Sequence, residues 1–519
     1  MSLIARQSAR GALLSLIGGC IGFITTFFIT TKVLTPEEIG LVRLLVEVAT
    51  LLSGFALLAT NSSAIRYYPH FHVQEPHVPS SENPRNEGEK GLLKLLLIII
   101  SVGLSLCTLL YLLLKDPIIH YFAATDGSAS LFRHYYYAVL PLMIFLSVQT
   151  LMEVYCSLRQ RVAAPKLFRE VLLRLLHLLL YTTMAIVALR FNTFVTLFVV
   201  AYGIIALLCF GYGLHLHPSA LSERITPLPT TLKRDFIKYT LFTLASALGG
   251  SIISRLDIFM VSSQMGLQFS GIYTIAFFIV AVIEMPSRSI SAIYSPLVAL
   301  AISEQNRDKV EQLYLKVATQ QLLTGSIIFL LIWFNIDLLF ALIPHGTIYQ
   351  AGKWVVFFLG IGRLLDLTFN FGNAILRYSK YFVWTLAYTI ITTMATILFN
   401  LYLIKYLGIT GAAIGTLSTY LLSYTFQQIV LRHRAKIELP HGDLPRIFTF
   451  VLLLLLVHQG LDYTLHHHYP RLLDDTPWEH LFLATLIKNG TLLILGGYLL
   501  TKKLHCFREI WAELRQKKE

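Results

Sequence analysis

Fourteen apolar segments, each about the length of a membrane-spanning helix, divide this sequence of 519 residues. The hydrocarbon core of a bilayer is about 30 Å thick, so a helix needs about 20 apolar residues to cross it. Only 14% of the residues are charged, against about 25% in a soluble domain. The sequence therefore predicts an all-α polytopic membrane protein with about 14 transmembrane helices.

The segments predict the positions of the spans and of two tight turns. The first segment, about 23 residues long, exceeds the apolar region of a signal peptide, so we expect it to be retained as a span. Tight turns should join two pairs of spans, at residues 189–193 and 405–410. We expect spans at residues 11–33, 42–64, 92–114, 135–157, 169–189, 193–214, 237–262, 271–293, 317–342, 354–376, 382–404, 410–431, 447–464 and 480–500.

The positive charges indicate how the spans are oriented. With the N-terminus inside, the inner segments hold about 29 of the 42 Lys and Arg residues and the outer loops about seven, the asymmetry that cytoplasmic loops show. Both termini are therefore predicted to be cytoplasmic. These loops and their attraction to anionic lipid account for the formal charge of +13, so no nucleic-acid partner is expected.

A weak internal similarity predicts two repeats. Residues 35–42 and residues 267–273 each form a short outer loop that closes on Gly and apolar residues before a long apolar helix. Parallel repeats of this kind build several transporters, which place the substrate site at the repeat interface. We expect an N-terminal lobe at 1–215, a cytoplasmic linker at 216–235, a C-terminal lobe at 236–432, and two extra spans with a basic tail at 433–519.

The most polar intramembrane stripe lies in the tenth predicted span. Arg363, Asp366, Asn370 and Asn373 follow one another at i, i+3, i+7 and i+10, which places them on one face of a helix. Such a stripe needs a polar cavity or polar neighbours within the membrane. Two interpretations stay open: a substrate site, or a structural ion pair between Arg363 and Asp366 at helical spacing.

Three other spans each carry an arginine and an acid: Arg43 and Glu47, Arg255 and Asp257, and Glu284 and Arg288. Arginine stays charged and binds phosphate oxygens through two parallel hydrogen bonds, so the intramembrane arginines suit a phosphate or pyrophosphate ligand. Alternatively, they form ion pairs between helices or extend to the membrane surface. Arg255 and Asp257 are two residues apart and point to different faces of a helix, so at least one of them should find its partner elsewhere.

The sequence lacks the common catalytic and nucleotide-binding motifs. It contains no GxxxxGK[ST] loop, HExxH, GxSxG or paired-cysteine zinc pattern. We interpret the isolated Glu153 and His177 as helix-packing contacts rather than a proton relay. The glycine pair at Gly18 suggests a close approach of two helices or a flexible point. We therefore expect a transporter, with neither a catalytic centre nor a cofactor or metal.

Five loose motifs together resemble one family of transporters. They are Glu38-Ile-Gly40-Leu, Arg66-Tyr67-Tyr68, Arg255-Leu-Asp257-Ile-Phe-Met, Ser270-Gly-Ile-Tyr273 and Gly408-Ile-Thr-Gly-Ala-Ala413. With the fourteen-span layout, they make the chain similar to the lipid-linked oligosaccharide flippases of the polysaccharide transporter family. These proteins belong to the multidrug/oligosaccharidyl-lipid/polysaccharide (MOP) exporter superfamily.

The resemblance implies two six-helix lobes around a central cavity, plus two C-terminal helices, in the bacterial inner membrane. It also implies alternating access coupled to a gradient of H+ or Na+. The implied cargo is an oligosaccharide on polyprenyl pyrophosphate, carried to the outer leaflet for surface polysaccharide biosynthesis, such as that of lipopolysaccharide. We expect a monomer surrounded by membrane lipids.

On this basis we assign candidate roles to ten residues. The candidate substrate-binding residues are Arg363, Asp366, Asn370, Asn373, Arg288, Arg255 and Arg43. The candidates for cation coupling are Asp257, Glu284 and Glu47.

Alternative functions also fit parts of the sequence. A lipid II flippase or a multidrug antiporter of the same superfamily would share the fold, although intramembrane arginines disfavour cationic drugs. A membrane-embedded polysaccharide polymerase or ligase would share the composition. Such an enzyme would be expected to carry a large outer loop with catalytic Arg or His, whereas the outer loops expected here are short, the longest having about 20 residues between the third and fourth spans.

Overall fold

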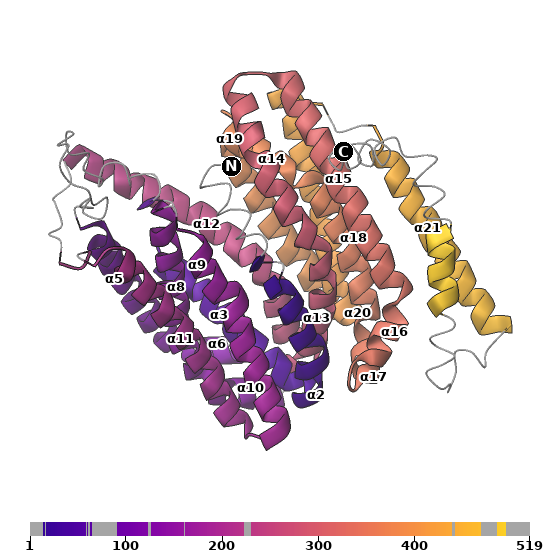
Figure 1. Ribbon diagram of the computed structural model, residues 1–519, viewed down its shortest axis with the longest axis horizontal. Coiled ribbons are helices and arrows are strands. Elements are labelled where there is room, and N and C mark those ends of the chain that lie inside the picture. The colour runs from indigo at the N-terminus through magenta and orange to yellow at the C-terminus, as the bar shows by residue number, and fades with distance from the viewer. Residues whose placement is uncertain are drawn as a thin grey trace, which may run out of the picture. The chain divides into compact units, whose positions relative to one another are not determined.

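The computed structural model describes residues 14–15, 17–58, 60, 63–64, 91–122, 126–159, 161–218, 220–222, 230–438, 442–468 and 485–494. Within these residues every regular element is a helix (Figure 1). The chain divides into two compact units, Met1–Thr274 and Ile275–Glu519, and we describe each by itself.

The first unit is built around α3, which packs against α5, α8 and α12. Helix α8 packs in turn against α11, and α11 against α10. The elements of this unit are η1 (Thr25–Thr30), α2 (Thr31–Val33), α3 (Pro36–Ala56), α5 (Leu92–Leu113), α6 (Lys115–Tyr121), α7 (Asp126–Tyr135), η2 (Tyr136–Ala138), α8 (Val139–Leu158), α9 (Ala163–Lys166), η3 (Leu167–Leu172), α10 (Leu173–Val187), α11 (Phe191–Leu216), α12 (Thr230–Met265) and the first part of α13 (Leu267–Ala281).

In the second unit α18 packs against both α15 and α20, and α15 also packs against α14 and α21. The elements that follow α13 are η4 (Val282–Glu284), α14 (Met285–Ser303), α15 (Arg307–Phe334), α16 (Ile336–Leu342), α17 (Gly346–Tyr349), η5 (Gln350–Gly352), α18 (Lys353–Phe369), α19 (Phe371–Tyr378), α20 (Val383–Val430), η6 (Leu431–Ala435) and α21 (Leu444–His468).

The all-α prediction with about 14 transmembrane helices is confirmed. In the described part of the chain, ten helical segments are long and apolar enough to cross a membrane, and a shorter apolar helix covers Ile17–Val33. One of the ten, Val383–Ala435, contains two predicted spans. The seventh predicted span lies within α12, and residues 485–494 of the fourteenth are helical.

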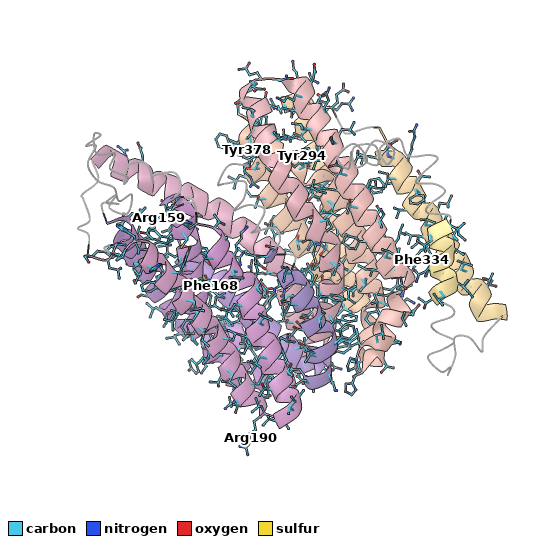
Figure 2. The ribbon with its side chains drawn as sticks, in the orientation of Figure 1. Arg159, Phe168, Arg190, Tyr294, Phe334 and Tyr378 are labelled. Carbon is cyan, nitrogen blue, oxygen red and sulfur yellow. The ribbon has the colours of Figure 1, made fainter. Side chains whose placement is uncertain are left out.

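Both predicted tight turns are present. Helix α10 ends at Ala188 in the left-handed region, with φ 51°, and Arg190 is extended just before α11 begins. Arg190 projects from the end of this helix pair (Figure 2). The long α20 is interrupted at Gly408, with φ 58° and ψ −141°, a backbone conformation that favours glycine.

The two segments predicted to be repeats lie against each other at the starts of α3 and α13. Thr35 and Glu38 form a capping box at the start of α3, which satisfies two backbone donors. A Cβ atom at Gly40 would lie 2.0 Å from the carbonyl oxygen of Leu267, and one at Gly271 would lie 1.8 Å from that of Pro36. This reciprocal contact explains why both segments carry a glycine.

Candidate functional site

The candidate site of the second unit is centred on Arg363 of α18. Its Nη1 forms an ion pair with Glu284 at the end of η4, and lies 3.5 Å from Oδ2 of Asp366 one helical turn away. The same nitrogen donates a hydrogen bond to the Tyr420 hydroxyl, at 3.2 Å. The side chains of Arg363, Glu284 and Asp366 are 19%, 21% and 17% exposed, so this triad is largely withdrawn from the surface.

Aromatic side chains of α13 and α20 surround the triad. The Tyr424 hydroxyl donates a hydrogen bond to Asp366, and the rings of Tyr420 and Tyr424 lie 5.8 Å apart. The guanidinium of Arg363 lies 5.7 Å from the ring centre of Phe277, within the range of a cation–π contact. Gly362 lets α20 approach, because a Cβ there would lie 3.3 Å from the Tyr420 ring.

The triad contains two carboxylates and one guanidinium. Among the described residues, no second cation contacts Glu284 or Asp366. The sequence suggests Arg288 as a partner for Glu284 at i+4, but the side chain of Arg288 lies outside the described residues. With both acids ionised, the described cluster therefore has a formal charge of −1, and a proton or a metal cation would neutralise it.

The other two residues of the predicted stripe, Asn370 and Asn373, pair with each other. Helix α18 ends at Phe369 and α19 begins at Phe371, but Asn370 between them keeps helical dihedral angles, φ −58° and ψ −27°, so the predicted span continues through it. Nδ2 of Asn373 donates a hydrogen bond to Oδ1 of Asn370, at 3.3 Å. The stripe is thus two local pairs, one charged and one amidic.

The first unit contains a second group of charged side chains, on α3 and α12. Glu47 forms ion pairs with two arginines, one through each carboxylate oxygen. Its Oε1 lies 2.6 Å from Nη2 of Arg43, and its Oε2 lies 2.9 Å from Nε of Arg255. Asp257 instead accepts a hydrogen bond from the Tyr273 hydroxyl, at 3.0 Å. The prediction that at least one of Arg255 and Asp257 finds its partner elsewhere is confirmed, because Arg255 pairs with Glu47 of α3.

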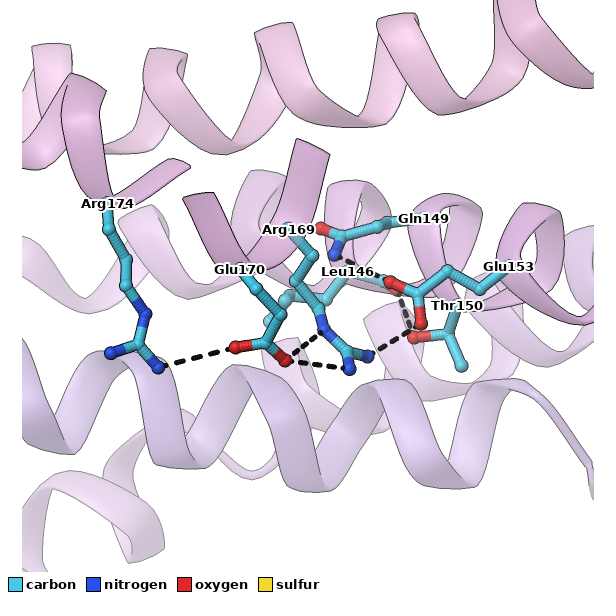
Figure 3. Close-up of polar contacts among 7 residues, drawn as sticks. All are labelled: Leu146, Gln149, Thr150, Glu153, Arg169, Glu170 and Arg174. Carbon is cyan, nitrogen blue, oxygen red and sulfur yellow. Dashed lines mark hydrogen bonds and ion pairs between the residues drawn. The ribbon is translucent and has the colours of Figure 1, made fainter. Parts of the chain in front are cut away.

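A third polar group, on α8, η3 and α10, contains residues that the sequence analysis missed. Arg169 lies between two carboxylates, 2.6 Å from Glu153 and 3.0 Å from Glu170 (Figure 3). Glu170 also contacts Arg174, at 3.4 Å. The interpretation of Glu153 as a helix-packing contact agrees with this geometry. The signal in the sequence that could have identified this group is the adjacent pair Arg169 and Glu170, at the start of the fifth predicted span.

This third group also fixes the first apolar helix. Nη1 of Arg174 donates a hydrogen bond to the carbonyl oxygen of Gly18, at 2.8 Å. A Cβ at Gly18 would lie 2.0 Å from the carbonyl oxygen of Glu170, and one at Gly22 would lie 2.1 Å from the Arg174 side chain. The predicted close approach at Gly18 is therefore present.

Comparison with known proteins shows a shared fold. No protein-family model and no curated protein sequence matches the chain. The lipid II flippase MurJ, in an inward closed conformation, matches with TM-score 0.66 and 12% identity, over 95% of this chain and 98% of that chain.

Two multidrug transporters also match. An inward-facing multidrug resistance MATE family transporter of the MOP superfamily gives TM-score 0.61 and 16% identity, over 82% of this chain and 98% of that chain. A mutant of the Vibrio cholerae MATE transporter VcmN gives TM-score 0.56 and 14% identity, over 83% and 96%. The chain thus has the fold of these transporters, and with its apolar helices the architecture of a multi-pass membrane protein.

Proposed function

We propose that this protein is a secondary transporter that moves an oligosaccharide linked to polyprenyl pyrophosphate from the inner to the outer leaflet. Transport proceeds by alternating access and is coupled to a cation gradient. The fold shared with MurJ and MATE transporters supports the transporter class. The observation that carries the proposal is the triad in which Arg363 is shared by Glu284 and Asp366.

The triad supports cation coupling because its two acids exceed its one described base. Burying an uncompensated charge away from water is costly. A triad without a bound cation therefore disfavours any conformation that closes it off from solvent. A proton or Na+ bound by Glu284 and Asp366 removes that cost and permits the closed conformation. Hydrogen bonding from Tyr424 keeps Asp366 in place for the cation.

The arginines support an anionic cargo. Arg43 and Arg255 both contact Glu47, so two guanidinium groups converge where one carboxylate now binds. A pyrophosphate carries more charge and more acceptor oxygens than a carboxylate, and arginine binds such groups through paired hydrogen bonds. The head group of the cargo competes with Glu47 for these arginines.

A lipid II flippase is the second candidate, favoured by the MurJ match over 95% of this chain. Lipid II and a lipid-linked oligosaccharide share the polyprenyl pyrophosphate and differ in the attached sugars and peptide. The arginines of the first unit suit both cargoes, so the choice between them depends on the head group.

Reconstitution in liposomes tests the proposal. Fluorescent lipid-linked oligosaccharide and fluorescent lipid II are each supplied in one leaflet, and their appearance in the other leaflet is followed. We expect protein-dependent flipping of the oligosaccharide lipid, reduced in the Arg43→Ala, Arg255→Ala variant. Faster flipping of lipid II would favour the second candidate, and no flipping of either lipid would reject the function.

A further inference from the structure

The second unit contains a pocket of about 350 Å³ that the proposed function leaves without a role. It lies between α18 and the second half of α20. Leu365 and Phe369 form its wall on α18, and Leu421 and Ile429 line it from α20. The last two side chains are 52% and 53% exposed, so the pocket opens to the outside of the helix pair along an apolar surface.

One end of the pocket is basic. Arg432 and His433 line it from η6, the continuation of α20. Both are exposed, and neither forms a hydrogen bond or ion pair with another residue in the part of the chain that the structure describes. By contrast, the neighbouring Arg434 lies over the Trp384 ring, 5.6 Å from its centre, and does not line the pocket.

We propose that this pocket binds an anionic phospholipid of the inner leaflet. One acyl chain lies along the apolar wall, and the phosphate contacts Arg432 and His433. The charge pattern of the sequence predicts this end of α20 to be cytoplasmic, where anionic lipids attract basic residues. Arginine also suits a phosphate through paired hydrogen bonds.

The size of the pocket favours a single lipid chain over a sugar head group. Its volume of about 350 Å³ is near the lower end of the range for small-molecule sites, about 300–1,000 Å³. The apolar wall offers few hydrogen bonds for an oligosaccharide. One acyl chain of an abundant membrane phospholipid fits both the small volume and the apolar wall.

Two pocket residues also contact the triad. Tyr420 and Tyr424 line the pocket, and their hydroxyl groups contact Arg363 and Asp366 respectively. A bound acyl chain restricts the rotamers of these tyrosines and thereby holds the triad in its paired arrangement. The lipid is therefore expected to change transport as well as stability.

Thermal unfolding of the purified full-length protein in detergent tests the binding site. The probes are dioleoyl phosphatidylglycerol and, with the same chains, dioleoyl phosphatidylcholine. We expect the anionic lipid to raise the unfolding midpoint saturably and more than the zwitterionic lipid. In the Arg432→Ala, His433→Ala variant, loss of the charge-assisted hydrogen bonds should weaken the apparent affinity for the anionic lipid about tenfold or more.

Arg434→Ala is the matched control, because it removes the same charge from the same helix outside the pocket. It should keep the wild-type response. If it loses the response as fully as the double variant, general surface charge explains the effect and the site is rejected. A double variant with wild-type affinity also rejects it.

A second variant tests the apolar part of the pocket while keeping its basic end. Thr425 is exposed and lines the pocket, so Thr425→Trp should fill it without disturbing the core. We expect this variant to lose the response to phosphatidylglycerol, and a retained response overturns the proposal. Polyprenyl phosphate is the competing occupant: if it raises the midpoint at lower concentration than phosphatidylglycerol, the pocket binds the tail of the cargo instead.

Discussion

Removing Arg363 should destabilise the protein far more than removing either of its acidic partners. Arg363→Ala leaves Glu284 and Asp366 as two like charges, each about one-fifth exposed, without a cation among the described residues. Breaking a buried ion pair in this way costs about 3–5 kcal/mol. The lost contact with Phe277 adds about 0.5–1 kcal/mol.

Asp366→Asn, by contrast, should change the stability of the protein little or increase it. It leaves Arg363 paired one-to-one with Glu284, and the asparagine carbonyl still accepts the hydrogen bond from Tyr424. The excess negative charge of the described cluster is removed, so we expect the change in unfolding free energy to stay within about 1 kcal/mol of zero or to be stabilising.

The assay is the thermal unfolding midpoint of the full-length protein in detergent, measured at one scan rate because membrane proteins often unfold irreversibly. Arg377→Ala is the control, since Arg377 is exposed at the end of α19. The expected order of midpoints is Asp366→Asn at or above wild type, Arg377→Ala near wild type, and Arg363→Ala well below.

A charge-neutral combination separates the electrostatic cost from lost packing. Replacing Arg363 and Asp366 together leaves Glu284 without its described partner, so the triple variant Arg363→Gln, Glu284→Gln, Asp366→Asn is the appropriate comparison. It should recover most of the midpoint lost in Arg363→Ala. An Asp366→Asn variant as unstable as Arg363→Ala, or an unaffected Arg363→Ala, would refute the assigned charge balance.

Three further predictions concern the rest of the chain. Gly271→Ala should lower the unfolding midpoint, because its Cβ would lie 1.8 Å from a backbone oxygen and overpacking costs about 1–3 kcal/mol. Gly211→Ala is the control, since the space around its Cβ is open. Equal unfolding midpoints for the two variants would contradict the close contact at Gly271. Arg169→Gln should lower the midpoint by leaving two acids together, and Glu153→Gln added to it should recover part of the loss; no recovery would show that the pair is not coupled. A reporter fused at Asn83 should read as cytoplasmic, and an external signal would overturn the predicted topology.

The helices and turns were predictable from the sequence because their causes are local. Runs of about 20 apolar residues define the spans, and the conformation of Gly408 requires a residue without a side chain. The predicted tenth span continues through Asn370, which keeps helical dihedral angles. What the spacing did not show is that the stripe forms two separate pairs, Arg363 with Asp366 and Asn370 with Asn373.

The charged residues of the site lie on helices, as predicted, but most of their partners were not predicted. Helical spacing shows which residues share a face, whereas packing brings together residues far apart in the chain. Arg363 and Glu284 are joined across two helices, as are Arg255 and Glu47. The Arg169 network escaped notice for the same reason, because Glu153 lies on the preceding span.

The most direct test of the coupling proposal compares wild type with Asp366→Asn in proteoliposomes that carry a defined H+ or Na+ gradient. The rate at which lipid-linked oligosaccharide reaches the opposite leaflet is measured with and without the gradient. We expect one of the two gradients to accelerate flipping by wild type. Asp366→Asn, which lacks the acid excess of the described cluster, should flip at a rate that no longer depends on the gradient. If the variant is accelerated as much as wild type, the triad is not the site of cation coupling.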